Sequence, residues 1–185
     1  MNEAKAWSST PQPEGCIFPT QFYIDIEHNQ FMIGSRFAPG IELFSYLLEK
    51  TETNFEYHQK ELKIVALKLS KKLNDMIDWL KSIGIVHSDI KLENLSTLNK
   101  GMSVFLFDWG LVKILPHPDS DINNILPKYW PRNGTPGYVP PLSVQDINKY
   151  HDRFSVAALV AYMINGHTQI PLRTIVQFFE EEIFQ

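Results

Sequence analysis

The most regular hydrophobic pattern in the chain runs from Glu61 to Ile83, where apolar residues recur every three or four positions. Lysines occupy the opposite side, so the spacing predicts one amphipathic helix that packs on a core. Gly84 follows directly, at the place where a left-handed residue commonly ends a helix. A shorter helix is predicted from Glu42 to Leu48, just after the chain breaker Pro39-Gly40.

Two stretches predict antiparallel hairpins because β-prone residues flank typical turn residues. The first covers residues 21–34, with a turn at His28-Asn29. The second covers residues 92–107, with a turn at Asn99-Lys100-Gly101. Hairpins and helices in one chain indicate a mixed α+β fold.

The last third of the chain combines a long irregular segment with two predicted helices. Residues 116–141 are rich in Pro, Asp, Asn and Gly and show no period, and a loop of that length in a compact domain is usually functional. Residues 154–164 are apolar nearly all round, which predicts a buried helix, and residues 175–184 predict an amphipathic one.

Composition narrows the class of protein. A chain of 185 residues with 44% apolar and 21% charged residues is typical of one globular domain. The net charge of -4 and the lack of a clustered stripe of Lys and Arg along the sequence argue against a nucleic-acid partner. The single Cys16, a polar N-terminus without a secretory pattern, and no apolar stretch near the ~20 residues of a membrane span predict a cytoplasmic protein.

Four polar motifs follow one another in a fixed order. They read HSDIKLEN at residues 87–94, DWG at 108–110, GTPGYVPP at 134–141 and DRFSVA at 152–157. An isolated H-x-D tripeptide would indicate only a loop with a self-capping Asp. The ordered set resembles the catalytic loop H-R-D-x-K-x-x-N, the D-F-G motif, the G-T-x-x-Y-x-A-P-E segment and the start of the central helix of eukaryotic-type protein kinases.

The resemblance implies metal-assisted phosphoryl transfer from ATP. Asp89 corresponds to the residue that accepts or orients the substrate hydroxyl, and Lys91 to the positive charge beside the transferring phosphoryl group. Asn94 and Asp108 correspond to the oxygen ligands of Mg²⁺ and, together with Lys91, to the residues that bind the nucleotide phosphates. Asp152 is expected to hold the backbone of the catalytic loop from below.

The resemblance also predicts the domain organisation. Residues 1–20 are expected to form an irregular tail and residues 21–185 a truncated kinase-like domain. Within it, residues 21–40 would be the remnant strands and hinge of the small lobe, and residues 41–185 the mainly helical large lobe with short hairpins. No G-x-G-x-x-G loop and no V-A-I-K strand precede the hinge, so most of the small lobe is expected to be absent.

Several family positions carry different residues here. Ser88 replaces the arginine that pairs with a phosphorylated activation segment, so control by phosphorylation of Ser120 or Thr135 is not expected, and Thr135 should act by packing or hydrogen bonding instead. Trp109 replaces the usual Phe, and Leu142 replaces the Glu of A-P-E. These changes leave retention of catalysis open.

The preferred interpretation is an atypical minimal protein kinase that uses Mg²⁺-ATP to phosphorylate Ser or Thr of a protein substrate. A pseudokinase acting as a protein-interaction module is the alternative, and a small-molecule phosphotransferase is a third. Removal of the small lobe would leave Phe31, Ile33 and Phe37 near an open surface, so a partner is expected to cover the hinge face.

Overall fold

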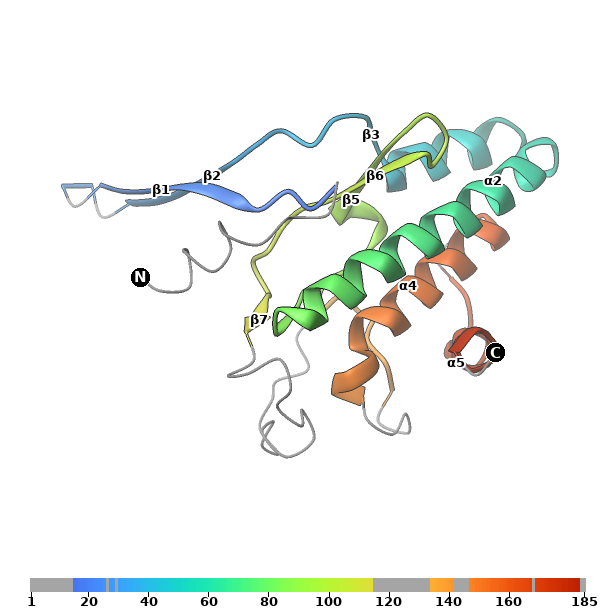
Figure 1. The fold of residues 1–185 in the computed structure, drawn as a ribbon. Helices are drawn as coiled ribbons and strands as arrows, with labels where there is room; N and C mark the ends of the chain where they lie inside the picture. Colours follow the sequence, from blue (N-terminus) through green and yellow to red (C-terminus); the bar gives the residue numbers. More distant parts are fainter. Residues whose placement is uncertain are drawn as a thin grey trace.

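The computed structural model describes residues 15–25, 27–28, 30–114, 134–141, 147–167 and 169–183. Figure 1 shows a helical layer on one side and small sheets on the other, with one hairpin extending away from the body. The described elements, in chain order, are β1 (Pro19–Asp25), β2 (Gln30–Ser35), β3 (Ile41–Glu42), α2 (Leu43–Ser82), β4 (Ile85–Val86), the 3₁₀ helix η1 (Leu92–Asn94), β5 (Leu95–Leu98), β6 (Ser103–Leu106), β7 (Lys113–Ile114), α4 (Ile147–Asn165) and α5 (Leu172–Ile183).

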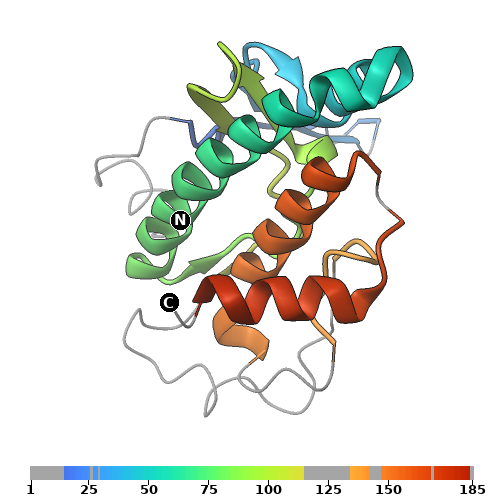
Figure 2. The ribbon, with the colours of Figure 1, turned by 90° about the vertical axis from the view of Figure 1, so that its right-hand side faces the viewer.

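The core lies between the helices. α2 packs along α4, and α4 packs against α5, which crosses below them in Figure 2. α4 includes the predicted buried stretch, and its residues Phe154, Leu159 and Met163 are fully buried. None of the described helices is long and apolar enough to cross a membrane.

The two helices predicted before Gly84 form one element in the structure. α2 continues through residues 49–60, which the sequence left unassigned because their mostly polar side chains show no apolar period. It bends at Asn54, whose backbone is extended (φ -170°, ψ 93°). The Asn54 side-chain oxygen accepts a hydrogen bond from the backbone N–H of Tyr57 at 3.1 Å, so it caps the second half of the helix.

The predicted end of the long helix is confirmed. Gly84 has φ 74°, a conformation that glycine adopts at little cost, and its N–H bonds to the carbonyl of Lys81 at 3.0 Å. The chain leaves the helix there and enters β4, which pairs antiparallel with β7. This pairing places the segment after Val86 beside the segment before Lys113.

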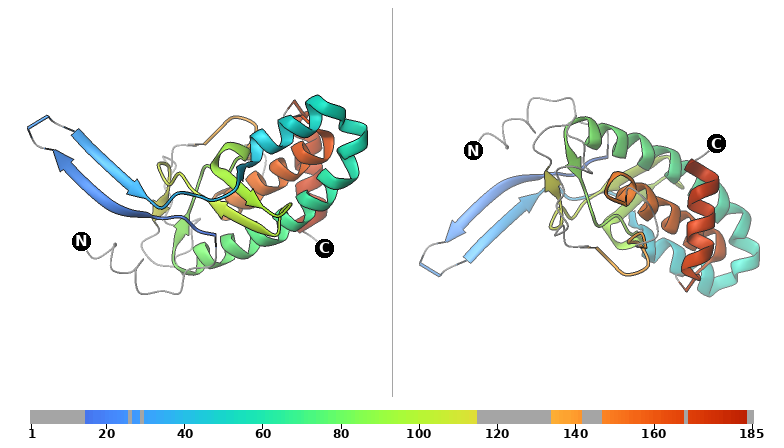
Figure 3. Two further views of the ribbon diagram at one scale, coloured as in Figure 1. Left: turned by 90° about the horizontal axis from the view of Figure 1, so that it is seen from above. Right: turned by 90° about the horizontal axis from the view of Figure 1, so that it is seen from below.

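The first predicted hairpin is confirmed as the antiparallel pair β1–β2, with Gln21 opposite Gly34 and Asp25 opposite Gln30. Both views in Figure 3 show it projecting from the rest of the molecule. The side chains of Phe31 and Ile33 lie outside the described part of the chain, but Phe37, which follows the hairpin, is 90% exposed.

The second hairpin is present but shorter than predicted. Its strands β5 and β6 pair with Leu95 opposite Leu106, and β3 adds a third strand on the other side of β5. Residues 92–94 form a 3₁₀ turn instead of strand, because the N–H of Asn94 bonds to the carbonyl of Lys91 at 3.1 Å. That turn gives Asn94 its position in the site described below.

The end of the segment assigned to the tail packs against the body. Cys16 and Phe18 are buried, the N–H of Leu106 bonds to the carbonyl of Gly15 at 2.8 Å, and the N–H of Ile17 bonds to the carbonyl of Leu106 at 2.9 Å. Gly15 has φ 106°, and a Cβ there would collide with the carbonyl oxygen of Val104. Residues 15–18 therefore behave as part of the core.

Candidate active site

One buried carboxylate holds the backbone of the catalytic loop, residues 87–94, in place. Asp152 of α4 accepts hydrogen bonds from the backbone N–H of His87 (2.8 Å) and of Ser88 (2.9 Å). The predicted role of Asp152 is thereby confirmed. Burial alone would raise the pKa of Asp152, but the neighbouring His151 and His87 outweigh it, so that pKa lies below its ordinary value. The carboxylate is therefore ionised over the physiological pH range.

His87 connects the loop to the strand that precedes the D-W-G motif. Its Nε2 lies 3.2 Å from the carbonyl oxygen of Phe107, and its Nδ1 lies 3.3 Å from the backbone N–H of Asp89. Burial lowers the pKa of His87, which favours the neutral ring. With its proton on Nε2, that ring donates to Phe107 and accepts from Asp89, so both nitrogens are satisfied.

The carboxylate of Asp89 is the centre of a hydrogen-bond network. Thr135 donates to its Oδ1 at 2.7 Å, Asn94 Nδ2 donates to its Oδ2 at 3.1 Å, and Lys91 Nζ lies 3.1 Å from Oδ2. Lys91 also donates to Thr135 Oγ1 at 3.1 Å. Burial would raise the pKa of Asp89, but the bonds from Thr135 and Lys91 and the charge of Lys91 outweigh it and lower that pKa.

The two residues expected to bind the metal are linked through the backbone. Asn94 Nδ2 also donates to the carbonyl oxygen of Asp89 at 2.9 Å, and the Asn94 carbonyl accepts from the N–H of Phe107 at 3.1 Å. Phe107 immediately precedes Asp108, so this bond brings Asp108 next to the catalytic loop. Asp108 itself is exposed, has φ 62°, and accepts from the N–H of Gly110 at 3.2 Å.

An open pocket of about 700 Å³ lies between the segment that follows β2 and Asp108. Its charged lining residues are three carboxylates, Glu42, Glu93 and Asp108, and one guanidinium, Arg36. The apolar side is lined by Phe37, Ala38 and Phe107, together with Gly40. A pocket with apolar walls and a few polar groups is typical of a small-ligand site.

The donor set fits Mg²⁺ bound together with phosphate oxygens. No group of three or more His, Cys, Asp or Glu side chains is close enough to hold a metal within the described ranges. Mg²⁺ commonly uses only one or two protein oxygens and completes its shell with phosphates and water. The carboxylate of Asp108 and the amide oxygen of Asn94 match that requirement, because both hydrogen bonds of the Asn94 amide use its nitrogen.

Trp109 is packed into the core by the segment before β1. Its ring stacks on Phe18 (centroids 4.2 Å apart) and meets His87 edge-on (4.6 Å). Its Nε1 donates to the carbonyl oxygen of Ile17 at 2.6 Å. A phenylalanine could not make that bond, so tryptophan ties residues 15–18 to the motif that carries Asp108.

Replacing Trp109 by Phe should lower the free energy of unfolding by about 1–3 kcal/mol, because the partly buried carbonyl of Ile17 loses its donor. Denaturant unfolding monitored by circular dichroism measures this change. Trp79→Phe serves as the control, since Trp79 is only partly buried and contacts Phe18 at the longer centroid distance of 6.1 Å. Equal losses in both variants would contradict a specific role for the indole N–H.

The residues that the sequence analysis related to control by phosphorylation differ in their burial and hydrogen bonds. Ser88 is fully buried with φ 70°, and its hydroxyl has no partner among the described residues. Thr135 uses its hydroxyl in the Asp89 network, which agrees with the expected hydrogen-bonding role. Ser120, Leu142 and most of the segment 116–141 lie outside the described residues.

Sequence reasoning missed three parts of the site. It did not foresee the backbone bridge through Phe107, the aromatic stack on Phe18, or Tyr138, whose hydroxyl accepts from the N–H of Leu92 at 3.4 Å. Tyr138 lies within a recognised motif, so its motif position was an available signal. No sequence signal reveals a contact between Phe18 and Trp109, which are distant in the chain.

The comparison with protein families agrees with the site. The family model described as "Protein kinase domain" matches residues 20–185. Because the match covers most of the chain, the chain belongs to the protein kinase family. The kinase-like α+β fold expected from the motifs is therefore confirmed.

Similar proteins include serine/threonine kinases at low identity. The chain is 28% identical over 151 residues to "Probable serine/threonine-protein kinase 2" of Plasmodium falciparum, covering 80% of this chain and 26% of that protein. It is 29% identical over 149 residues to "Calcium/calmodulin-dependent protein kinase type 1" of Macrobrachium nipponense, covering 78% of this chain and 38% of that protein. The chain thus spans well under half the length of these two relatives.

A solved structure shares the fold. The Cydia pomonella granulovirus kinase PK-1 matches with a TM-score of 0.52 and 22% sequence identity, over 89% of this chain and 55% of that one. At this identity the likeness concerns the fold alone.

Proposed function

We propose that this chain is an atypical, minimal serine/threonine protein kinase that transfers a phosphoryl group from Mg²⁺-ATP to a protein hydroxyl. The observation that supports this most directly is the carboxylate of Asp89, which is held by Thr135, Asn94 and Lys91. Its loop is bonded to the pocket through Phe107, a lining residue whose N–H donates to the Asn94 carbonyl.

Asp89 is suited to act as the base. Its lowered pKa keeps it ionised near neutral pH, and the bonds from Thr135 and Asn94 fix the direction of its lone pairs. A substrate hydroxyl placed at hydrogen-bond distance from Asp89 would therefore be oriented for attack. Lys91 would carry positive charge at the same point, close to where charge develops during transfer.

The charge of the pocket favours a nucleotide that carries a divalent cation. Glu42, Glu93 and Asp108 outnumber Arg36, so the phosphates of free ATP would meet net negative charge. Mg²⁺-ATP, when bound, would supply the phosphoryl group and the positive charge that offsets these carboxylates. Asn94 and Asp108 are the residues that would hold the metal.

A protein substrate is preferred to a small molecule. The preference rests on Lys91, two residues after Asp89, which resembles kinases that modify Ser or Thr better than small-molecule phosphotransferases. Serine/threonine kinases among the relatives favour the same substrate class. A confined acidic acceptor pocket would instead favour a small-molecule substrate.

A docking module without catalysis is the second candidate. Phe37 is 90% exposed at the hinge, on the rim of the pocket and directly after the projecting hairpin. A hairpin of two strands gains little stability alone, so a partner that covers the hinge face and extends this sheet would stabilise it. A partner that adds a phosphate-binding cation would complete an enzyme, whereas one that adds only apolar surface would not.

Thermal shift with Mg²⁺-ATP tests the proposed function. At a ligand concentration of about 100 Kd, binding to the native state alone adds about 2.7 kcal/mol to the free energy of unfolding, so the Tm should rise. Asp108→Ala should abolish the rise, because the metal loses a carboxylate ligand. Asp75→Ala is the matched control, since Asp75 is exposed on α2, away from the pocket.

Each outcome of this experiment decides one point. Equal Tm shifts in the wild type and in Asp108→Ala would show that the metal assignment is wrong. No shift in the wild type at any accessible Mg²⁺-ATP concentration would favour the docking module over the enzyme.

A further inference from the structure

The solvent face of α2 carries a short surface that combines unpaired lysines with exposed apolar side chains. Lys60, Lys63, Lys68 and Lys71 are all exposed, and none of them forms a salt bridge or a hydrogen bond with another described residue. We call these four residues and the apolar side chains among them the lysine face. Sequence analysis placed lysines on this side of the helix but recognised no clustered basic stripe, because the cluster forms only when the helix turn brings them together.

The apolar part of the lysine face lies between the lysines. Ile64 is 46% exposed and Leu67 is 49% exposed, and at helical spacing they point to the same side as Lys60 and Lys71. Met102, from the turn between β5 and β6, adds a third apolar side chain that is 56% exposed. The opposite side of α2 is buried in the core, so these residues are not needed for packing against it.

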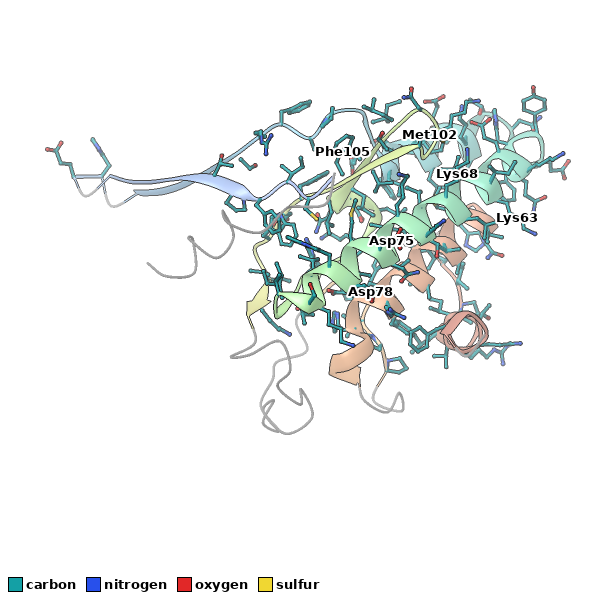
Figure 4. All side chains as sticks on the ribbon, in the orientation of Figure 1. Lys63, Lys68, Asp75, Asp78, Met102 and Phe105 are labelled. Carbon is teal, nitrogen blue, oxygen red and sulfur yellow. The ribbon has the colours of Figure 1, made fainter. Side chains whose placement is uncertain are left out.

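The turn that carries Met102 sits directly on the helix. A Cβ at Gly101 would lie 3.3 Å from Val65 Cγ1 and 3.6 Å from the Cβ of Lys68. Figure 4 shows Lys63 and Lys68 on the side of α2 turned to the viewer, with Met102 above Lys68. Two separate elements therefore contribute to one surface.

Acidic residues limit the lysine face at both ends. Glu56 is exposed one turn before Lys60, and Asp75 and Asp78 follow Lys71 along the helix, as Figure 4 shows for the two aspartates. The basic stretch from Lys60 to Lys71 is thus about 17 Å long at 1.5 Å per residue. Glu61, the acidic residue within this stretch, is already engaged by Lys100 (3.3 Å) and by the hydroxyl of Tyr46 (2.8 Å).

We propose that the lysine face is a docking site for an acidic peptide segment of a partner protein, one that presents apolar side chains flanked by Asp or Glu. Charge complementarity selects the acidic partner, because four unpaired lysines gather here on a chain whose net charge is -4. Ile64, Leu67 and Met102 contribute the apolar contact that gives such a segment its register.

A membrane surface and a nucleic acid fit the lysine face less well. From Leu62 to Leu80 α2 is fixed to the core by a row of buried side chains, so Ile64 and Leu67 cannot enter a bilayer to the depth of an interfacial helix. An extended anionic surface would also meet Glu56, Asp75 and Asp78. A basic stretch of three helical turns bounded by carboxylates suits a short, discrete partner.

The probe is a fluorescein-labelled synthetic peptide of about 12 residues with two leucines among glutamates, matched to the length of the lysine face. Fluorescence anisotropy measures its binding to the whole chain. Lys63→Glu combined with Lys68→Glu should weaken binding at least about tenfold, and raising the ionic strength from about 0.05 to about 0.3 M should weaken it as well. Lys81→Glu, an exposed lysine beyond Asp78, is the matched control and should bind like the wild type.

Two further binding measurements distinguish the contribution of charge from that of apolar contact. Leu67→Ser should weaken binding, whereas Leu48→Ser, a similarly exposed leucine near the start of α2, should not. A peptide with lysines in place of glutamates should bind the double charge-reversal variant more tightly than it binds the wild type. The Tm of each variant, measured first, confirms that the lobe is folded.

Three results would overturn the proposal. The first is no binding of the acidic peptide by the wild type at low salt, and the second is equal binding by the control and the charge-reversal variant. The third is tighter, lysine-dependent binding to vesicles containing phosphatidylserine or to a single-stranded RNA oligonucleotide than to the peptide, which would assign the surface to a membrane or to a nucleic acid.

Discussion

Asp89→Asn should lower the rate of phosphoryl transfer by about 10²–10⁴-fold, because an amide cannot accept the proton of the substrate hydroxyl. The amide oxygen can replace Oδ2 and accept from Asn94 and Lys91, and the amide nitrogen can donate to the Thr135 hydroxyl, so the loop should keep its conformation. Transfer of ³²P from ATP to a generic protein substrate, measured with saturating Mg²⁺, gives the rate. Nucleotide binding, followed by the Tm shift, should change little.

Two comparisons make this result specific. Glu56→Gln, a neutralised carboxylate on the exposed surface of α2, should leave the rate unchanged. Because the pKa of Asp89 is lowered, the wild-type rate should be flat between about pH 5 and pH 8 as far as this group is concerned, and should fall only in more acid solution as the carboxylate is protonated. An Asp89→Asn variant as active as the wild type would exclude Asp89 as the base.

Asp152→Ala should be the most destabilising of the substitutions considered, by about 3–5 kcal/mol in the free energy of unfolding. It leaves the buried N–H groups of His87 and Ser88 without an acceptor, since each now bonds to one oxygen of that carboxylate. Asp152→Asn keeps one acceptor oxygen and should cost less. Urea denaturation gives the free energy of unfolding of the wild type, Asp152→Ala and Asp152→Asn.

The neighbouring Asp78 supplies the control. Its carboxylate pairs with Arg153 at the surface, and exposed pairs of this kind contribute about 0–1 kcal/mol, so Asp78→Ala should change stability little. A loss in Asp152→Ala no larger than in Asp78→Ala would contradict the assigned role of Asp152.

The pH dependence of stability provides an independent check on Asp152. Its folded-state pKa is lower than the value of about 3.9 for an unfolded Asp. Its contribution is therefore fully present above the unfolded pKa and is lost as the pH falls through the folded-state pKa. The difference in stability between the wild type and Asp152→Ala should accordingly shrink below about pH 4.

The Asp152 and Asp89 predictions test different properties of the same loop. Asp152 contacts the backbone of the loop, and Asp89 faces the network that contains Lys91. A chain that folds but has no kinase activity would agree with the Asp152 prediction and contradict the Asp89 prediction. That combination would point to the docking module.

Local patterns in the sequence were sufficient for many elements of the fold. The helix ending at Gly84, both hairpins and the buried helix before Asn165 follow from periodicity and turn chemistry, which depend on residues close in the chain. The ordered motifs also singled out Asp89, Lys91, Asn94 and Asp108 together. These features were accessible because each is encoded within a short stretch of sequence.

Only the tertiary structure decided how distant segments meet. Residues 15–18 look like a continuation of an irregular tail, yet Phe18 stacks on Trp109 and the carbonyl of Ile17 accepts from its indole N–H. The lysine face and the bridge from Phe107 to Asn94 likewise join residues whose contact has no local signature. Burial and hydrogen bonding between remote segments depend on the packed fold as a whole. A pattern of residues along the sequence does not show which distant segments lie close together in space.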